Sequence, residues 1–262
     1  MRKHLAVSAL AAGLAVATLV APAHADHSWS NYHWATTSTG VPLQLGDNVD
    51  DSWQGYYNTA ITDWNSTTWA LVPSAAPGGT TGKRCRPTAG RVEVCNAAYG
   101  RNGWLGLAQI WLSGSHITQG AAKMNDTYFK MAKYNNPSER QHVLCQEVGH
   151  TFGLGHTSED GSSQGTCMDY SQSATSTRPN QHDYDLLKSK YAHLDSANTY
   201  ATSLASTPLT GAQRSMAGEV PMGVRVHKGV FHETWAAADG KGGTWIHHVT
   251  LAAGFEHTDL LH

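Results

Sequence analysis

The chain has 262 residues, with 18 lysines and arginines against 20 aspartates and glutamates, which gives a formal net charge of −2. This nearly neutral balance, without a cluster of basic residues, argues against a protein that binds nucleic acid. A chain of this length can bury a core for one catalytic domain and a small additional element.

The first residues have the features of a secretory signal peptide. Arg2 and Lys3 precede an apolar run over 5–20, and Ala23-His24-Ala25 follows as a small-x-small cleavage site. A membrane anchor is the alternative, but the apolar run is short for a bilayer and ends at the cleavage pattern. We therefore predict a signal peptide over residues 1–25 and a secreted mature protein that does not associate with the membrane.

The four cysteines are expected to form two disulfides, because an exported chain meets an oxidising environment. Three pairings are possible, and closeness in the sequence favours Cys85–Cys95 and Cys145–Cys167. The second bond closes a loop whose length corresponds to a stabilisation of roughly 3 kcal/mol. Cys145 could instead bind a metal or act as a catalytic thiol, but on a helix it lies about 100° away from Gln146, off the face that carries the metal-binding positions.

Sequence patterns predict a strand, a helix and then further strands in the first half. Aromatic and β-branched residues favour a strand over 29–37, and a helix capped by Asp50 or Asp51 follows. Residues 73–82, rich in Pro, Gly and Thr, are expected to form a loop, and strands are predicted over 91–95 and 104–112. The helix carries an apolar stripe of 3.6-residue period, made of Trp53, Tyr56, Tyr57, Ala60, Ile61 and Trp64.

A second helix is predicted over 137–152, because Asn136 can cap it and Pro137 suits its first position. Gln146 and His150 are four residues apart, so they lie about 40° apart on one face of this helix. Glu147 lies between them on the same side. The helix therefore presents two metal-binding positions and a carboxylate together.

The helix is followed by a turn that can add another metal ligand. Gly153 permits the positive φ that ends a helix and reverses the chain. The turn then brings His156 towards the face that carries His150.

Residues 145–156 closely resemble the long zinc signature of the metzincin metallopeptidases, HExxHxxGxxH. Glu147, His150, Gly153 and His156 match this signature, whereas Gln146 stands in place of the first histidine. The resemblance implies Zn²⁺ held by His150, His156 and the amide oxygen of Gln146, a weaker donor than imidazole. It also implies that Glu147 is the general base that activates a zinc-bound water.

Two further residues, both C-terminal to this signature, strengthen the resemblance. Metzincins place a methionine on a tight turn below the zinc, and Met168 lies where that turn is expected. In some branches of the family a tyrosine two residues later stabilises the oxyanion, and Tyr170 has that spacing. The alternative for Tyr170 is an aromatic side chain that only packs in the turn.

The resemblance covers about residues 29–194 and implies an α+β fold. Its expected parts are a twisted, mostly parallel sheet with an edge strand for substrate, a backing helix, an active-site helix, the methionine turn and a C-terminal helix. That last helix is predicted to start near Asn180. We place the metzincin-like domain at 26–197, and residues 198–262 form a linker and a small β-hairpin appendage.

The resemblance also implies how a substrate binds. Residues 105–108 are similar to the matrixin edge strand, which pairs with an extended peptide. Leu107 and Ala108 are therefore expected to contact the backbone of a peptide or protein substrate, although an ordinary sheet strand would have the same sequence. We expect the protein to act as a monomer.

The C-terminal region is predicted to contain two strands, over 224–235 and 244–251, that form a hairpin around residues 239–243. A lone hairpin is marginally stable, so it is expected to pack on the main domain. Its four histidines could suggest a second metal, but histidines scattered along strands usually have no such role. They are His227, His232, His247 and His248.

The sequence therefore predicts a secreted zinc-dependent endopeptidase. The alternative is an inactive pseudoprotease that keeps the fold and acts as a secreted binding or inhibitory protein, because Gln146 replaces a zinc ligand. A third possibility is that another group completes the metal site, with Asp160 and Asp169 as candidates that no spacing rule selects.

Overall fold

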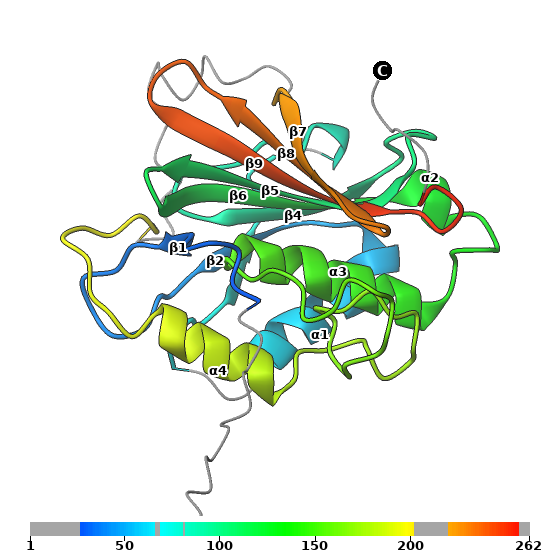
Figure 1. Ribbon diagram of the computed structural model, residues 1–262, viewed down its shortest axis with the longest axis horizontal. Helices are drawn as coiled ribbons and strands as arrows, with labels where there is room; N and C mark the ends of the chain where they lie inside the picture. The colour runs from blue at the N-terminus through cyan, green and yellow to red at the C-terminus, as the bar shows by residue number, and fades with distance from the viewer. Residues whose placement is uncertain (1–26, 66–68, 81, 202–219, 257–262) are drawn as a thin grey trace, which may run out of the picture.

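The computed structural model describes residues 27–65, 69–80, 82–201 and 220–256. The predicted signal peptide lies outside these ranges. Within them the protein is an α+β structure, in which one large sheet is covered on one face by helices (Figure 1). None of the helices in these ranges is long and apolar enough to cross a membrane.

The sheet is mixed rather than mostly parallel. Its strand order is β3-β2-β4-β6-β5-β9-β8-β7, and the short β1 pairs with β6. The four pairings among β1, β2, β3, β4 and β6 are parallel, and the four that join β5, β6, β7, β8 and β9 are antiparallel. The strands are β1 (His33–Trp34), β2 (Gln44–Asn48), β3 (Ser74–Pro77), β4 (Val92–Ala97), β5 (Trp104–Ser113), β6 (His116–Asn125), β7 (Val224–Lys228), β8 (His232–Ala238) and β9 (Gly243–Leu251).

The predicted helix starts are confirmed. Asp50 caps α1 by accepting a hydrogen bond from the Ser52 amide, and Asn136 caps α3 by accepting one from the Glu139 amide. Asn180 caps the last helix. The helices are α1 (Asp51–Trp64), α2 (Asp126–Phe129), α3 (Pro137–Thr151) and α4 (Gln181–Lys190), and a 3₁₀ turn covers Gly82–Arg84.

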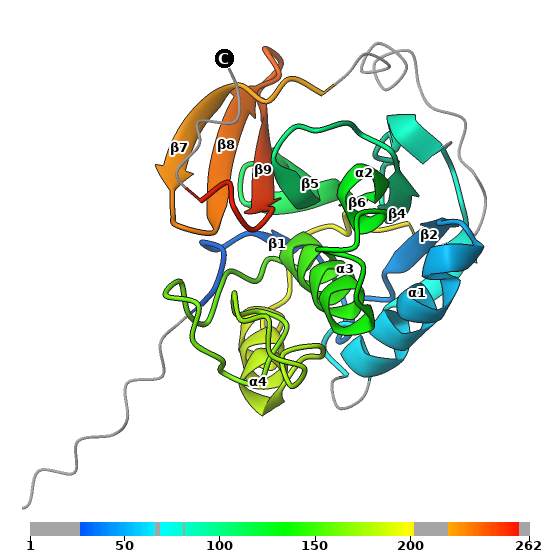
Figure 2. The ribbon, with the colours of Figure 1, turned by 90° about the vertical axis from the view of Figure 1, so that its right-hand side faces the viewer.

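Helix α3 packs against β5 and β6 with α1 beside it, and these contacts fix the position of its functional face (Figure 2). The buried stripe of α1 packs against it, and the Trp64 indole donates a hydrogen bond to the Cys145 carbonyl. The Cys145–Cys167 bond ties α3 to the segment around Met168, as predicted. The second predicted bond, Cys85–Cys95, is also confirmed.

Two strand predictions near the N-terminus need correction. The expected strand over 29–37 is reduced to His33–Trp34. The expected loop over 73–82 contains β3, whose residues Ser74–Pro77 pair with β2 at the sheet edge. The alanines and proline of β3 have low strand propensity, so tertiary pairing rather than local sequence makes it a strand.

The expectation that the strand after Gly103 is an edge strand is wrong. Strand β5 is paired on both sides, with β6 and with β9. The predicted C-terminal hairpin forms β8 and β9, and these strands extend the same sheet beyond β5 together with β7 (Figure 2). Backbone groups of β5 that could pair with an extended substrate are therefore already bonded to β9.

A close approach inside the core gives a test of this packing. A Cβ added at Gly149 of α3 would lie 2.5 Å from the Met168 sulfur and 2.7 Å from the Trp64 ring. We expect Gly149→Ala to lower the free energy of unfolding by about 1–3 kcal/mol, because overpacking outweighs the better helix propensity of alanine. Urea unfolding of the purified protein measures this change.

Gly55→Ala is the matched control, since Gly55 is exposed in α1 and an added Cβ there meets nothing within 4 Å. It should stabilise the protein by about 0.5–1 kcal/mol. Equal stability of the two variants would contradict the close contact between α3 and Met168.

Candidate metal centre

Helix α3 and the turn after it bring two of the predicted ligands together. His150 is completely buried in the last turn of α3. Gly153 has the expected positive φ of +87°, and a Cβ there would lie 2.1 Å from the Tyr32 carbonyl oxygen. The reversed chain then places the His156 ring 4.6 Å from the His150 ring, centre to centre.

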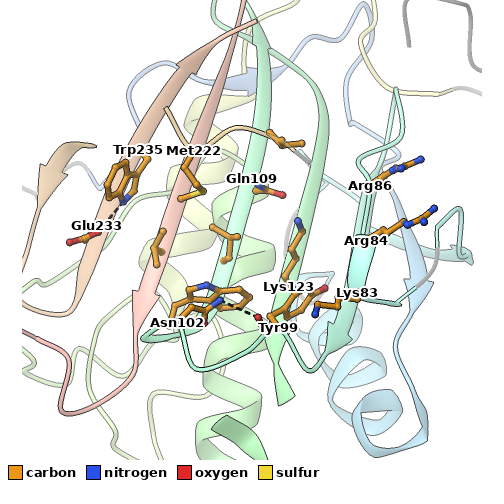
Figure 3. A pocket seen from close by; sticks show the side chains of 14 residues that line it. Lys83, Arg84, Arg86, Tyr99, Asn102, Gln109, Lys123, Met222, Glu233 and Trp235 are labelled. Carbon is orange, nitrogen blue, oxygen red and sulfur yellow. Dashed lines mark hydrogen bonds between the residues drawn. The ribbon is translucent and has the colours of Figure 1, made fainter. Parts of the chain in front are cut away.

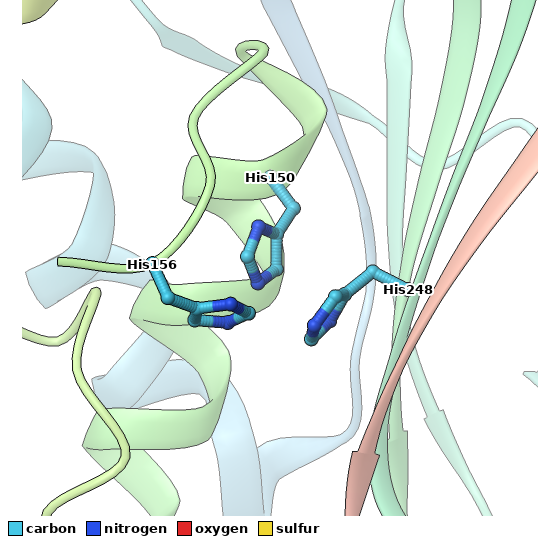
Figure 4. A group of neighbouring side chains, drawn as sticks. All are labelled: His150, His156 and His248. Atoms are coloured by element: carbon cyan, nitrogen blue, oxygen red, sulfur yellow. The ribbon is translucent and has the colours of Figure 1, made fainter. Parts of the chain in front are cut away.

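The third imidazole comes from the C-terminal region. His248 of β9 lies with its ring centre 3.9 Å from that of His150 and 4.5 Å from that of His156. Each of the three histidines offers a nitrogen, and these nitrogens all lie within 4.8 Å of one another. Figure 4 shows the three rings converging from α3, the following turn and β9.

Hydrogen bonds on the far side of each ring orient these imidazoles. His150 Nδ1 lies 2.8 Å from the Leu154 carbonyl oxygen, which can only accept, so Nδ1 carries the proton and Nε2 keeps its lone pair. The Tyr170 hydroxyl lies 2.7 Å from His156 Nδ1 and 3.0 Å from His248 Nε2. A hydroxyl oxygen has two lone pairs and can accept from both rings, which leaves His156 Nε2 and His248 Nδ1 as donors to a metal.

The remaining ring nitrogens satisfy the requirements of a cation site. His150 Nε2, His156 Nε2 and His248 Nδ1 are buried and have no hydrogen-bond partner. Buried polar atoms are normally paired, so three such atoms in one place call for an explanation. Three neutral imidazoles suit zinc and neighbouring transition metals.

Glu147 completes the group from one step earlier on α3. Its Oε1 accepts a hydrogen bond from the Thr250 hydroxyl at 2.6 Å, and its Oε2 lies 3.8 Å from His248 Nδ1 without a hydrogen-bond partner. Burial raises the pKa of Glu147 to about 7, against the lowering influence of His150 and Thr250. A carboxyl group with this pKa can take up and release a proton near neutral pH.

Burial has the opposite effect on the histidines. Together with the nearby imidazoles, it lowers the pKa of His150 and of His248 to about 3. The pKa of His156 is also well below its ordinary value for the same reasons. The rings are therefore neutral at pH 7, which is the form that binds metals.

The structure does not bring the Gln146 side chain into this group. Its amide nitrogen donates to the carbonyl oxygens of Cys167 at 3.0 Å and Asp169 at 2.7 Å, and its oxygen faces the Thr250 hydroxyl at 2.9 Å. His142 donates to the same Asp169 carbonyl. Gln146 thus holds the methionine turn against α3, and His248 occupies the position beside His150 and His156 where a third ligand was expected.

The structure also shows where the other predicted site residues lie. Met168 is buried against Gly149 of α3. Ala108 pairs with His248 and Leu107 pairs with Val249, so β9 lies where a substrate backbone was expected. Both alternative ligands belong to loops: Asp169 accepts from the backbone amides of Gln164 and Ser171, and Asp160 accepts from the serines beside it.

Sequence reasoning missed His248 because the hairpin histidines have no ligand spacing along the chain. The one available signal was their position on strands, since neighbouring residues of a strand point to opposite faces. His247, the neighbour of His248, contacts Gln109 at 2.9 Å and the Pro221 carbonyl at 3.0 Å. Only the pairing of β9 with β5 decides which of the two histidines faces α3.

Two cavities lie on opposite sides of this part of the sheet. A cavity of about 350 Å³ adjoins the three histidines and is also lined by Trp29, Glu159 and His232. A larger one, of about 450 Å³, lies on the face to which Leu107 and Val249 point. Figure 3 shows its two walls, with Lys83, Arg84 and Arg86 on one side and Met222 and Trp235 on the other. Of these two cavities, the first is the one lined by His150, His156 and His248.

Comparison with protein-family models finds no match for this chain, and comparison with curated proteins finds none either. What the site does is therefore inferred from its residues and their geometry.

The neutral histidines predict that the metal-free protein is sensitive to acid. Between pH 6.5 and pH 3 the unfolded chain protonates His248, whereas the folded protein cannot, so stability falls as the pH falls through this range. From pH 7 to pH 5 this one group should remove about 2 kcal/mol, at 1.36 kcal/mol per pH unit. Urea unfolding in the presence of a chelator, compared for wild type and His248→Gln, measures the difference. An equal loss in both proteins would contradict a buried neutral His248.

Proposed function

We propose that this protein is a secreted zinc-dependent endopeptidase of the metzincin kind. The observation that supports this best is a set of four buried atoms without hydrogen-bond partners. Three are ring nitrogens of His150, His156 and His248, and the fourth is Oε2 of Glu147. Three ligands beside a carboxylate are what a catalytic zinc site needs, since a catalytic zinc keeps one coordination position open.

Zinc bound by these imidazoles would supply a Lewis acid that polarises the scissile carbonyl and lowers the pKa of water. Glu147 lies beside this position on α3. As a carboxylate it takes a proton from the attacking water, whose oxygen forms a bond to the carbonyl carbon. It then passes the proton to the nitrogen of the leaving amine as the carbon–nitrogen bond breaks.

Tyr170 supports the site in two ways. Its hydroxyl oxygen bonds to His156 and His248 and so holds both rings in place. Burial raises its pKa well above the ordinary value, so the hydroxyl stays protonated at neutral pH. A protonated phenol in this position can donate to an oxyanion, which is the role that the sequence predicts.

Substrate would reach the site through the cavity of about 350 Å³ rather than along β5, because β9 is paired with β5 over its whole length. This cavity is bordered by Trp29 and by the partly exposed Glu159 and His227. It can take a short part of a peptide chain, so cleavage is expected in flexible or terminal segments.

The covered strand favours a second candidate function. A protein whose β5 edge is permanently filled by β9 could hold zinc without cleaving peptides, and act as a secreted binding protein. Both candidate functions include a bound zinc ion, but only the first includes peptide cleavage.

The ligand set gives the first test. His248→Ala removes one of three ligands and should therefore weaken zinc binding by more than about 100-fold. Loss of a residue that only hydrogen-bonds to a ligand typically weakens metal binding by about 10–100-fold. His247→Ala is the matched control: it lies next in the sequence, contacts Gln109 and Pro221, and should leave zinc affinity unchanged. Competition with a chromophoric chelator measures both affinities. Loss of zinc in Gln146→Ala but not in His248→Ala would contradict this ligand set.

The carboxylate gives the second test. Glu147→Gln should keep zinc but lower the rate of peptide cleavage by roughly 10²–10⁴-fold, because proton transfer is lost. Glu139→Gln, on the first turn of the same helix and also buried, should cleave like wild type. Cleavage of a peptide library by the mature proteins, read by mass spectrometry, measures the rates.

If wild type holds zinc and cleaves no peptide, the binding-protein candidate is correct. Equal cleavage by wild type and Glu147→Gln would show that the activity does not come from this site.

A further inference from the structure

A second group of metal-binding side chains lies where the first strand meets the segment after α4. His33 belongs to β1, and His193 and Asp195 follow α4. We propose that these three side chains form a structural site for a divalent transition-metal ion such as zinc. It shares no residue with the centre at His150.

The donor atoms have the separations that such an ion requires. His33 Nε2 lies 3.0 Å from His193 Nε2 and 3.5 Å from Asp195 Oδ1, and His193 Nε2 lies 3.7 Å from that oxygen. Three points with these separations lie on a circle of radius about 2.0 Å, which equals the usual zinc–nitrogen and zinc–oxygen distance. One ion can therefore contact all three atoms without movement of the backbone.

Hydrogen bonds orient two of the donors in the way seen around metal ligands. His33 Nδ1 lies 2.6 Å from the Asn31 carbonyl oxygen and must carry the proton, so Nε2 presents its lone pair to the group. Asp195 Oδ2 accepts a hydrogen bond from the Thr36 amide at 2.9 Å, which leaves Oδ1 directed at the two histidines. His116 Nε2 also lies 3.2 Å from this Oδ1 and adds a further nitrogen beside the group.

The burial of the three side chains suits a metal that stabilises structure. The side chains of His33 and Asp195 are 8% and 11% exposed, so they form a fixed base for the ion. The side chain of His193 is 50% exposed, which leaves the site open to entry of an ion and a water ligand.

The site would join two segments that are about 160 residues apart in sequence. Hydrogen bonds already link them, from the Ala35 amide to Thr199 at 2.8 Å and from the Thr37 amide to Asn198 at 2.7 Å. An ion bound only by the folded state stabilises that state in proportion to its affinity and concentration. The expected role is to fasten the N-terminal segment to the end of the α4 segment.

The test uses the mature full chain with zinc as the probe. Wild type should retain two zinc ions per chain after removal of excess metal, measured by atomic emission. His193→Ala and Asp195→Asn should each retain one. The asparagine keeps the acceptor for Thr36 and removes the charged donor. Asp185→Asn, an exposed carboxylate on α4, is the control with the same change in charge and should retain two.

His248→Ala separates this proposal from the proposed function. It should retain one zinc ion, and addition of zinc should raise its melting temperature. The double variant His193→Ala/His248→Ala should retain none and show no such rise.

If His193→Ala and Asp195→Asn retain as much zinc as wild type, the proposal is overturned. The three side chains would then be a hydrogen-bonded cluster without a metal. One ion in wild type and none in His248→Ala would overturn the proposal too, and would leave the proposed function intact. One ion in wild type that is lost in His193→Ala and kept in His248→Ala would support this site and contradict the metal centre at His150.

Discussion

The antiparallel pairing of β9 with β5 is the constraint on which the candidate metal centre depends. Ala108 of β5 pairs with His248, and this register sets the direction of every side chain on β9. Because alternate residues of a strand point to opposite faces, a shift by one residue would turn His248 away from α3 and bring His247 towards it. The same register places Thr250 against Glu147. One strand pairing therefore positions both a metal-binding ring and the partner of the carboxylate.

This arrangement places polar groups where apolar ones would be less costly. Three imidazole nitrogens and a carboxylate oxygen are buried without hydrogen-bond partners, and such groups destabilise a fold unless something compensates for the lost water. Several contacts connect the surrounding structure to the helix that carries the site. The Cys145–Cys167 disulfide, the contact of Gly149 with Met168 and the packing of α1 hold α3 in position below the site. The burial that is costly also keeps the histidines neutral and able to bind a cation.

Gln146 has a structural role in the helix that carries His150. It lies one turn before His150, as a ligand would, but its amide carries two N–H donors and finds two backbone carbonyl oxygens within reach. An imidazole at this position could not donate to both at once. With the amide holding the turn around Met168, the third imidazole comes from β9. Helix α3, the turn after it and strand β9 thus each contribute one of the three imidazoles.

The local sequence by itself determined the three longer helices, the disulfides and most of the site, whereas α2 was not predicted. Asp50, Asn136 and Asn180 fix the starts of α1, α3 and α4 through hydrogen bonds within a few residues. Glu147, His150 and His156 converge because helical periodicity and the turn at Gly153 act over short distances.

The tertiary structure alone decided the strand order, the loss of the β5 edge, the place of Gln146 and the choice of His248. These features depend on which strands pair and in which register, and pairing joins residues such as Ala108 and His248 that are far apart in the sequence. The histidines and aspartate at 33, 193 and 195 meet for the same reason. The alternation of side chains along a strand indicates which residues share a face. Which strand it pairs with, and in which register, depends on the packing of the whole chain.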